Sequence, residues 1–147
     1  KGCSCTDKDI AWHRRKISGP IIDRIDLWVS VSKVEYEKLS GAQPNENSEV
    51  IRKRVELARK LQMKRFNKHG IKNKKFNSEM GASDITRCVT LSNEVKSLLT
   101  TSAERLALSG RAFHRIIKVA RTIADLGNEK EIQKEHILEA LQYRQRF

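Results

Sequence analysis

Apolar residues recur at helical spacing along the chain from residue 48 onward, and this pattern constrains the fold more than any other feature. Residues three and four apart lie on one face of a helix, so such spacing predicts amphipathic helices that pack together. The segment from a Ser109 cap to Leu126 shows it best, with an apolar face made of Phe113, Ile116, Ile117, Ala120 and Ile123. We therefore expect a mainly α protein, with a helical bundle over residues 48–147.

Capping residues mark where the other helices begin. Thr6 with Asp9 resembles a capping box, Ser48 and Ser92 precede helical patterns, and Gly127 follows the segment that begins at Ser109. The other predicted helices cover residues 7–16, 49–67, 83–89, 92–107 and 134–145. Residues 40–48 are typical of a turn-rich loop, and the Gly-, Asn- and Lys-rich residues 68–81 predict a mobile segment.

One strand is expected, over residues 25–31, where apolar and polar side chains alternate. A single strand cannot stand alone, so the missing partners indicate that residues 1–47 are a short α/β remnant of a larger domain. The chain also opens on Lys1 without a methionine. We therefore expect it to be an excised piece of a longer protein.

Composition narrows the class of protein. The chain has 147 residues, of which 38% are hydrophobic and 33% charged, as in a folded soluble domain. No apolar run approaches the ~20 residues needed to span a bilayer, and the start has no signal-peptide pattern. Three cysteines do not make a disulfide framework. These features predict a cytoplasmic protein without a membrane partner.

Positive charge is concentrated in one segment. The net charge is +12, and residues 50–76 carry eleven Lys and Arg against a single acid, Glu56. Such density favours nucleic acid, because binding phosphates releases counterions, although a solvated basic helix has the same composition. With little aromatic interleaving, any contact would be to phosphate and indifferent to sequence. The candidate DNA-binding residues are Arg52, Lys53, Arg59, Lys60, Lys64 and Lys68.

Two arginine-bearing segments are candidates for anion binding. Arg24 stands between a Gly19-Pro20 bend and the predicted strand, from where it can reach a neighbouring molecule's active site or form a salt bridge with Asp23 or Asp26. A second segment begins at a helix N-terminus, with basic residues spaced for one helix face. It suits a nucleotide phosphate or a solvated surface, and its residues are Arg111, Arg115 and Lys118.

Other chemistry is sparse. Cys3 and Cys5 could supply half of a tetrahedral zinc site, with Cys88 and His13 as candidate further ligands, but a lone C-x-C pair is a weak signal and fits free thiols better. The sequence contains no catalytic triad, no carboxylate pair and no phosphate-binding G-x-x-x-x-G-K-[ST] loop. We therefore expect no ATP hydrolysis by this chain alone.

Two long motifs resemble a known family. Residues 17–27 (ISGPIIDRIDL), preceded by Cys-Ser-Cys-Thr at 3–6, are similar to magnesium-chelatase-like AAA+ ATPases of the ComM (YifB) type. Residues 106–126 resemble the lid signature of that family, and residues 136–144 are similar to its ending. The resemblance implies the C-terminal part of a bacterial ATPase. Residues 1–47 would close the nucleotide-binding core and residues 48–147 would form the lid, with the Walker motifs upstream.

The resemblance also implies roles for individual residues. Arg24 stands where the family has its arginine finger, which acts in trans on the γ-phosphate of ATP in the adjacent subunit. Arg111 matches the sensor-2 position, which acts in cis, and Arg115 is its substitute if the register slips by one turn. Cys3 and Cys5 resemble the second pair of a cysteine cluster. The expected cofactors are ATP and Mg²⁺, with Zn²⁺ as a further candidate.

The implied function is ATP hydrolysis coupled to DNA remodelling, as in ComM-like branch migration during competence. The implied partners are the protein's own N-terminal ATPase core, further copies in a homo-oligomeric ring, expected as a hexamer, and DNA. Two alternatives stay open at this point. One is a subunit of a magnesium chelatase, which inserts the metal into a porphyrin. The other is a stand-alone basic helical DNA-binding module.

Overall fold

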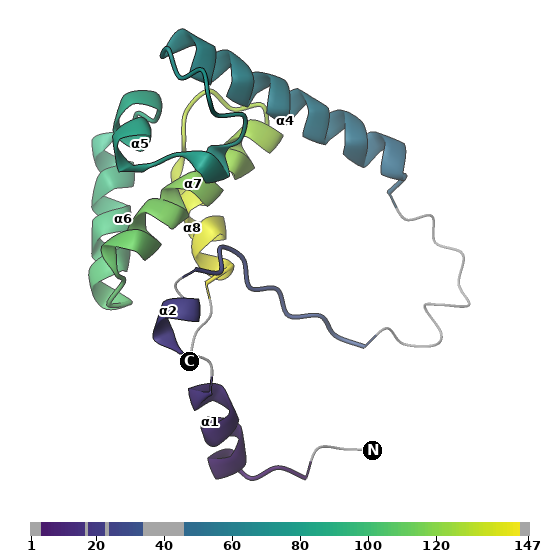
Figure 1. Cartoon of the computed structure of the whole chain (residues 1–147), viewed down its shortest axis with the longest axis vertical. Coiled ribbons are helices and arrows are strands. Elements are labelled where there is room, and N and C mark those ends of the chain that lie inside the picture. The colour runs from purple at the N-terminus through teal and green to yellow at the C-terminus, as the bar shows by residue number, and fades with distance from the viewer. Residues whose placement is uncertain (1–3, 17, 23, 34–45, 145–147) are drawn as a thin grey trace.

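The computed structural model describes residues 4–16, 18–22, 24–33 and 46–144, and all regular structure in these ranges is helical (Figure 1). This confirms the mainly α prediction. Residues 7–16 were predicted to be helical, and the observed helix ends one residue earlier. The elements are α1 (Asp7–Arg15), α2 (Gly19–Ile22), α4 (Ser48–Lys68), the 3₁₀ helix η1 (Asn77–Glu79), α5 (Ala82–Cys88), α6 (Asn93–Arg105), α7 (Gly110–Leu126) and α8 (Lys134–Gln142).

The predicted strand over residues 25–31 is wrong for this structure. Residues 25–33 are irregular, and the described part of the chain offers them no neighbouring strand with which to form a ladder. Their backbone contacts the bundle instead, because Trp28 N–H donates to the carbonyl oxygen of Tyr143 at 2.8 Å. Val31 remains 90% exposed. Of the alternating apolar residues, Ile25 is half-buried, whereas Leu27, Val29 and Val31 are exposed in the described chain.

Helix α7 lies at the centre of the bundle. It contacts α4, α5, α8 and η1, and α6 packs against α8 (Figure 1). Small residues on α7 allow this close approach, since Ala112, Ala120 and Ala124 are fully buried. The largest fully buried apolar side chains around them are Phe66, Val95, Leu99, Ile116, Ile132 and Ile137.

Most of the predicted caps are confirmed. Thr6 and Asp9 form a reciprocal pair, in which Thr6 N–H donates to Asp9 at 2.9 Å and Asp9 N–H donates to the Thr6 hydroxyl at 3.3 Å. The hydroxyls of Ser92 and Ser109 accept from backbone N–H groups in the first turns of α6 and α7. These bonds satisfy donors that a helix start otherwise leaves without partners.

Two helix ends differ from the prediction. The cap of α4 is Asn47 rather than Ser48, because the Asn47 side chain accepts from Glu49 N–H at 3.0 Å. Gly127 caps the C-terminus of α7 as expected, but with a φ of −80°. The left-handed turn falls on Asn128, with a φ of 57°. Asparagine tolerates this conformation better than most residues, so the chain reverses there at little cost.

The segment predicted to be mobile, residues 68–81, is instead packed against the bundle. Ile71, Asn77 and Met80 are buried. The backbone N–H of Asn77 donates to the Gln62 side chain at 3.1 Å, which fixes η1 against α4. Composition suggested a loop, but three inward-pointing side chains spaced along it supply the anchorage that composition does not reveal.

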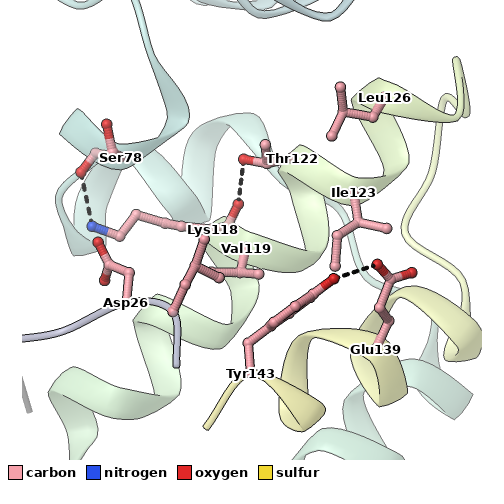
Figure 2. Close-up of a pocket in the computed structure, with 10 residues that line it drawn as sticks. Asp26, Ser78, Lys118, Val119, Thr122, Ile123, Leu126, Glu139 and Tyr143 are labelled. Carbon is pink, nitrogen blue, oxygen red and sulfur yellow. Dashed lines mark hydrogen bonds between the residues drawn. The ribbon is translucent and has the colours of Figure 1, made fainter. Parts of the chain in front are cut away.

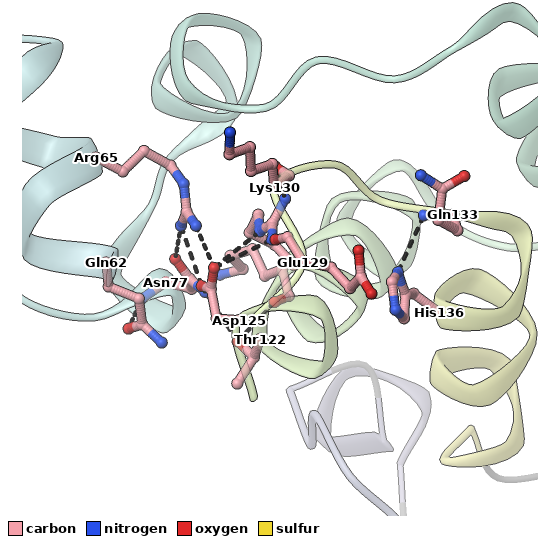
Figure 3. Close-up of polar contacts among 11 residues, drawn as sticks. Gln62, Arg65, Asn77, Thr122, Asp125, Glu129, Lys130, Gln133 and His136 are labelled. Atoms are coloured by element: carbon pink, nitrogen blue, oxygen red, sulfur yellow. Dashed lines mark hydrogen bonds and ion pairs between the residues drawn. The ribbon is translucent and has the colours of Figure 1, made fainter. Parts of the chain in front are cut away.

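A buried polar cluster joins α4 to α7 (Figure 3). Both oxygens of the Asp125 carboxylate accept hydrogen bonds from the Arg65 guanidinium, and Arg121 donates to the same carboxylate at 3.2 Å. Asn77 donates to Asp125 at 2.8 Å and to Thr122 at 3.1 Å. With each of these groups partnered, the cluster tolerates burial and sets the angle at which α4 leaves the bundle.

Candidate nucleotide site

Four basic side chains, drawn from two segments that are distant in sequence, line one cleft of about 720 Å³. Arg24 follows α2, whereas Arg111, Arg115 and Lys118 lie on α7, and the far wall is the turn that leads into α5. The structure thus brings together both arginine-bearing segments that the sequence singled out. The remaining residues that line the cleft are Met80, Gly81, Ala82 and His114.

Arg24 is exposed at the mouth of this cleft. Its guanidinium donates to the carbonyl oxygen of Pro20 at 3.2 Å, and its backbone N–H donates to the carbonyl oxygen of Ile21 at 2.9 Å. The predicted salt bridge with Asp26 is wrong, since Asp26 pairs elsewhere. The other proposed partner, Asp23, lies outside the described residues. Within the described chain Arg24 has no acidic partner, so most of its donors can meet an anion.

Arg111 occupies the first turn of α7. Its side chain is exposed, and the described residues place no carboxylate against it. The preceding Ser109 hydroxyl accepts from Ala112 N–H at 3.2 Å, which starts the helix cleanly at this point. The positive end of the helix dipole and the guanidinium therefore act in the same place, and both favour a negative ligand.

Arg115 and Lys118 are already engaged inside the protein. Arg115 forms a 3.0 Å ion pair with Asp26, and only 17% of its side chain is exposed. Lys118 donates to the carbonyl oxygen of Ser78 at 2.9 Å. Burial lowers the pKa of Lys118, the nearby charge of Asp26 opposes this, and Arg115 adds to the lowering. These two cations line the cleft, but Arg24 and Arg111 are the ones turned to solvent.

Lys118 also lines a second, mostly apolar cleft of about 290 Å³ (Figure 2). Its walls include Leu27, Val119 and Ile123, and Lys118 therefore borders both clefts. At its edge the Tyr143 hydroxyl donates to Glu139 at 3.2 Å, and the negative charge of Glu139 raises the pKa of Tyr143. With one cation and an otherwise largely apolar lining, this cleft suits a phosphate less well than the first.

The basic face of α4 is also exposed. All six candidate DNA-binding residues are exposed on this helix. At about 100° per residue, Lys53, Lys60 and Lys64 point almost directly away from the side that carries buried Ala58 and Phe66. Lys53 pairs with Glu49 at 3.1 Å, but Lys60 and Lys64 have no acidic partner among the described residues. The remaining candidates on this helix, Arg52, Arg59 and Lys68, are likewise exposed.

The residues described do not assemble a zinc site. No group of three His, Cys, Asp or Glu residues that could hold a metal ion occurs among them. Cys5 is exposed, and Cys3 lies outside the described residues. Cys88 ends α5, at the opposite end of the molecule from α1, which carries His13 (Figure 1). Cys88 and His13 therefore do not share a metal centre, and a zinc site that uses Cys3 and Cys5 stays a prediction.

The role of Asp26 is the main feature that sequence reasoning missed. Local spacing suggested Arg24 as its partner, whereas the structure pairs it with Arg115 on a distant helix. The sequence also gave no indication that Gly81 would line the cleft that contains Arg24 and Arg111. No periodicity signals either feature, because each depends on how α7 crosses a segment far away in the sequence.

Comparison with known proteins supplies the family. A model described as magnesium chelatase, subunit ChlI C-terminal, matches residues 45–144, and one described as magnesium chelatase, subunit ChlI, matches residues 1–39. The chain belongs to the magnesium chelatase ChlI family. The predicted family resemblance is thereby confirmed, and in this family member the matched C-terminal segment is the helical bundle described above.

This ChlI-family chain is similar in sequence to ComM and to related proteins. It is 35% identical over 138 residues to competence protein ComM of Haemophilus influenzae, covering 93% of this chain and 26% of that protein. It is 34% identical over 141 residues to protein YifB of Escherichia coli, covering 95% and 26%. Protein Mb2921c of Mycobacterium bovis is 31% identical over 143 residues, covering 97% and 28%.

The chain thus spans about a quarter of the length of the curated relatives it matches. These relatives make it a ComM-like member of the ChlI family. Each helix in the described ranges is too short or too polar to span a bilayer.

Proposed function

We propose that this chain is the lid region of a ComM-like, ATP-hydrolysing protein, in which Arg24 and Arg111 bind the phosphates of ATP. The observation that carries the proposal is their convergence. Two exposed arginines from distant segments line one cleft, and neither has an acidic partner within the described chain. In this proposal residues 1–47 belong with the ATPase core and residues 48–147 with the lid.

Phosphoryl transfer explains why arginine is needed at these positions. Negative charge must be held on the γ-phosphate oxygens while the bond to the leaving group breaks, and a positioned guanidinium does this. Its planar fork matches two phosphate oxygens, which the point charge of lysine does not. ATP with Mg²⁺ would be held by the Walker motifs of the ATPase core, and this chain would contribute the two guanidinium groups.

The test uses the full-length protein that contains this chain. Arg24→Ala should lower the turnover of ATP by about 10³–10⁵-fold, the range for known arginine fingers, while ATP binding stays nearly unchanged. Arg111→Ala should also lower turnover. Arg105→Ala removes an exposed arginine at the end of α6, outside the cleft, and is the matched control. Near-normal turnover in both cleft variants would remove the proposal.

Subunit mixing tests how the two arginines are shared in a ring. In one arrangement, Arg24 contacts ATP bound to the neighbouring subunit and Arg111 contacts ATP bound to its own subunit. A ring that mixes Arg24→Ala subunits with Arg111→Ala subunits then contains some ATP sites at which both arginines are present. ATP hydrolysis should therefore reappear on mixing. If both arginines of one subunit serve the same ATP, as their common cleft allows, no mixed site is complete and activity stays absent.

We propose a second function for the basic face of α4, which is binding the phosphate backbone of DNA. The specific support is that Lys60 and Lys64 are exposed, point away from the bundle and have no acidic partner in the described chain. Such a face would let ATP-driven movement of the lid act on DNA, which is the remodelling activity that a ComM-like protein implies. A face that only keeps the protein soluble is the competing explanation.

The alternative function, a magnesium chelatase subunit, would use the same ATP hydrolysis to act on a porphyrin in place of DNA. The relatives reported above favour the ComM-like proposal. Stimulation of the full-length protein's ATPase activity separates the two. DNA should increase turnover if the protein remodels DNA, whereas a chelatase subunit would respond to its partner subunits and porphyrin.

A further inference from the structure

Two polar contacts attach residues 25–33, the described stretch after Arg24, to the bundle. Asp26, two residues later, forms a 3.0 Å ion pair with Arg115 of α7. Trp28 N–H then donates to the carbonyl oxygen of Tyr143 at 2.8 Å. The first attachment is made by side chains that the sequence specifies, whereas the second uses backbone groups that almost any residue provides. The ion pair is therefore the attachment that substitution can test.

The ion pair joins residues that are close in sequence to the two arginines assigned to phosphate binding. Asp26 lies two residues from Arg24, and Arg115 lies one helical turn from Arg111. Only 17% of the Arg115 side chain and 42% of the Asp26 side chain are exposed. The two contact atoms, Asp26 Oδ1 and Arg115 Nη1, are buried and have no hydrogen-bond partner in the described chain, so the contact is a charge–charge attraction, which partial burial screens less than at a fully exposed pair.

The surroundings leave Asp26 few other partners. Figure 2 shows its carboxylate beside the Lys118 side chain, but the Lys118 ammonium donates to the Ser78 carbonyl oxygen. The other acid of that cleft, Glu139, accepts from the Tyr143 hydroxyl. Arg115 is thus the cation that pairs with Asp26, and it is correspondingly less available to a phosphate.

We infer that Asp26 and Arg115 are positioning residues, which hold Arg24 at a fixed separation from Arg111. This inference rests on the proposed function, since it assigns the pair a role in that same site. Arg115 then acts through Asp26 on the placement of Arg24 and does not itself bind phosphate. Misplacing a group by about 1 Å can lower an enzymatic rate by about 100-fold, so such a pair would matter for turnover.

The experiment compares variants of the full-length protein. Asp26→Asn and Arg115→Gln should each lower the turnover of ATP by about tenfold or more, while the dissociation constant of a non-hydrolysable ATP analogue stays within about twofold. The swap Asp26→Arg with Arg115→Asp restores an opposite-charge pair and should regain part of the turnover. Glu94→Gln breaks a surface ion pair with Lys134, away from the cleft, and is the matched control.

The outcomes separate this inference from the proposed function. If Asp26→Asn and Arg115→Gln turn over ATP like the control, the positioning role is wrong even where Arg24→Ala is inactive. If Arg115→Gln instead weakens binding of the analogue as strongly as it lowers turnover, Arg115 is a phosphate ligand and the inference is also overturned. Unchanged turnover in Arg24→Ala and Arg111→Ala defeats the proposed function itself. Melting temperatures show whether each variant is folded, and the charge swap distinguishes lost pairing from lost stability.

Discussion

Arg65 of α4 and Asp125 of α7 form an ion pair between positions 60 residues apart in sequence, with both carboxylate oxygens accepting from the guanidinium. The Asp125 side chain is completely buried, and 15% of the Arg65 side chain is exposed. Arg121 shares the same carboxylate. One carboxylate therefore pairs with two arginines, and a net positive charge remains, at the place where the long basic helix meets the centre of the bundle.

Removing this acid should destabilise the chain strongly. Asp125→Ala leaves Arg121 buried without its carboxylate, and breaking a buried pair in this way costs about 3–5 kcal/mol. Urea denaturation followed by circular dichroism measures the free energy of unfolding. The exposed pair of Glu94 and Lys134 is the comparison, since Glu94→Ala should cost less than about 1 kcal/mol. Equal losses in the two variants would contradict the role given to Asp125.

Stability should also depend on the ionisation of Asp84. The hydrogen bond from Lys74 lowers the pKa of Asp84, and the Gly81 N–H, which donates at 2.8 Å, lowers it further. A carboxyl whose pKa is lower in the folded state stabilises the fold above its unfolded pKa. That contribution is lost as the pH falls through the folded pKa.

Asp84→Asn should therefore lower the free energy of unfolding by about 1–3 kcal/mol at neutral pH, where the charged group is lost. The difference from the unmodified chain should shrink steadily as the pH is lowered below about 4. Urea denaturation at a series of pH values measures it. A difference that stays constant down to acid pH would show that the charge of Asp84 contributes nothing.

Cys88 should react slowly with alkylating reagents. Burial raises the pKa of its thiol, and the negative charge of Asp84 adds to this, so less thiolate is present at a given pH. With Cys3→Ser and Cys5→Ser in place, the rate of iodoacetamide reaction reports on Cys88 alone. That rate should be below that of a small-peptide thiol at pH 8 and should rise with pH. Unfolding in urea should abolish the difference.

The basic face of α4 gives a prediction that depends on salt. Lys60→Gln with Lys64→Gln should weaken DNA binding by the full-length protein. The slope of log affinity against log salt should fall by about 2, at about 0.9 for each phosphate that is no longer neutralised. Fluorescence anisotropy of a labelled duplex measures both quantities. Lys96→Gln with Arg105→Gln removes the same charge from exposed positions on α6. If the two double variants behave alike, the effect comes from net charge and not from this face.

The sequence predicts the helices well because their signals are local. The hydroxyl caps at Ser92 and Ser109 and the apolar stripe of α7 depend only on residues within a few turns. The strand failed for the opposite reason, because a strand is defined by its neighbour, and residues 25–31 have none in the described chain. A local pattern cannot show whether such a partner is present.

In the candidate site, too, features with a local sequence signal were predicted and contacts between distant residues were not. Arg24 and Arg111 were singled out from their local settings, and the structure brings them to one cleft. Their roles in ATP hydrolysis stay predictions. The pairing of Asp26 with Arg115 escaped prediction because it joins residues that meet only when α7 is folded against the N-terminal segment. The anchorage of residues 68–81 escaped as well, since it depends on where Asn77 meets Gln62.

The position of the Arg65 pair near the end of α4 has a mechanical consequence. The helix has 21 residues, and this pair anchors its C-terminal half together with buried Ala58 and Gln62, so the part before Ala58 extends about 15 Å beyond the anchored stretch. A tilt of about 10° at the anchored stretch would displace the free tip by about 3 Å, given the rise of about 1.5 Å per residue. A rotation of α7 would therefore move Arg52 and Lys53, near the free end of α4, further than Lys60 and Lys64, which lie beside the anchored stretch.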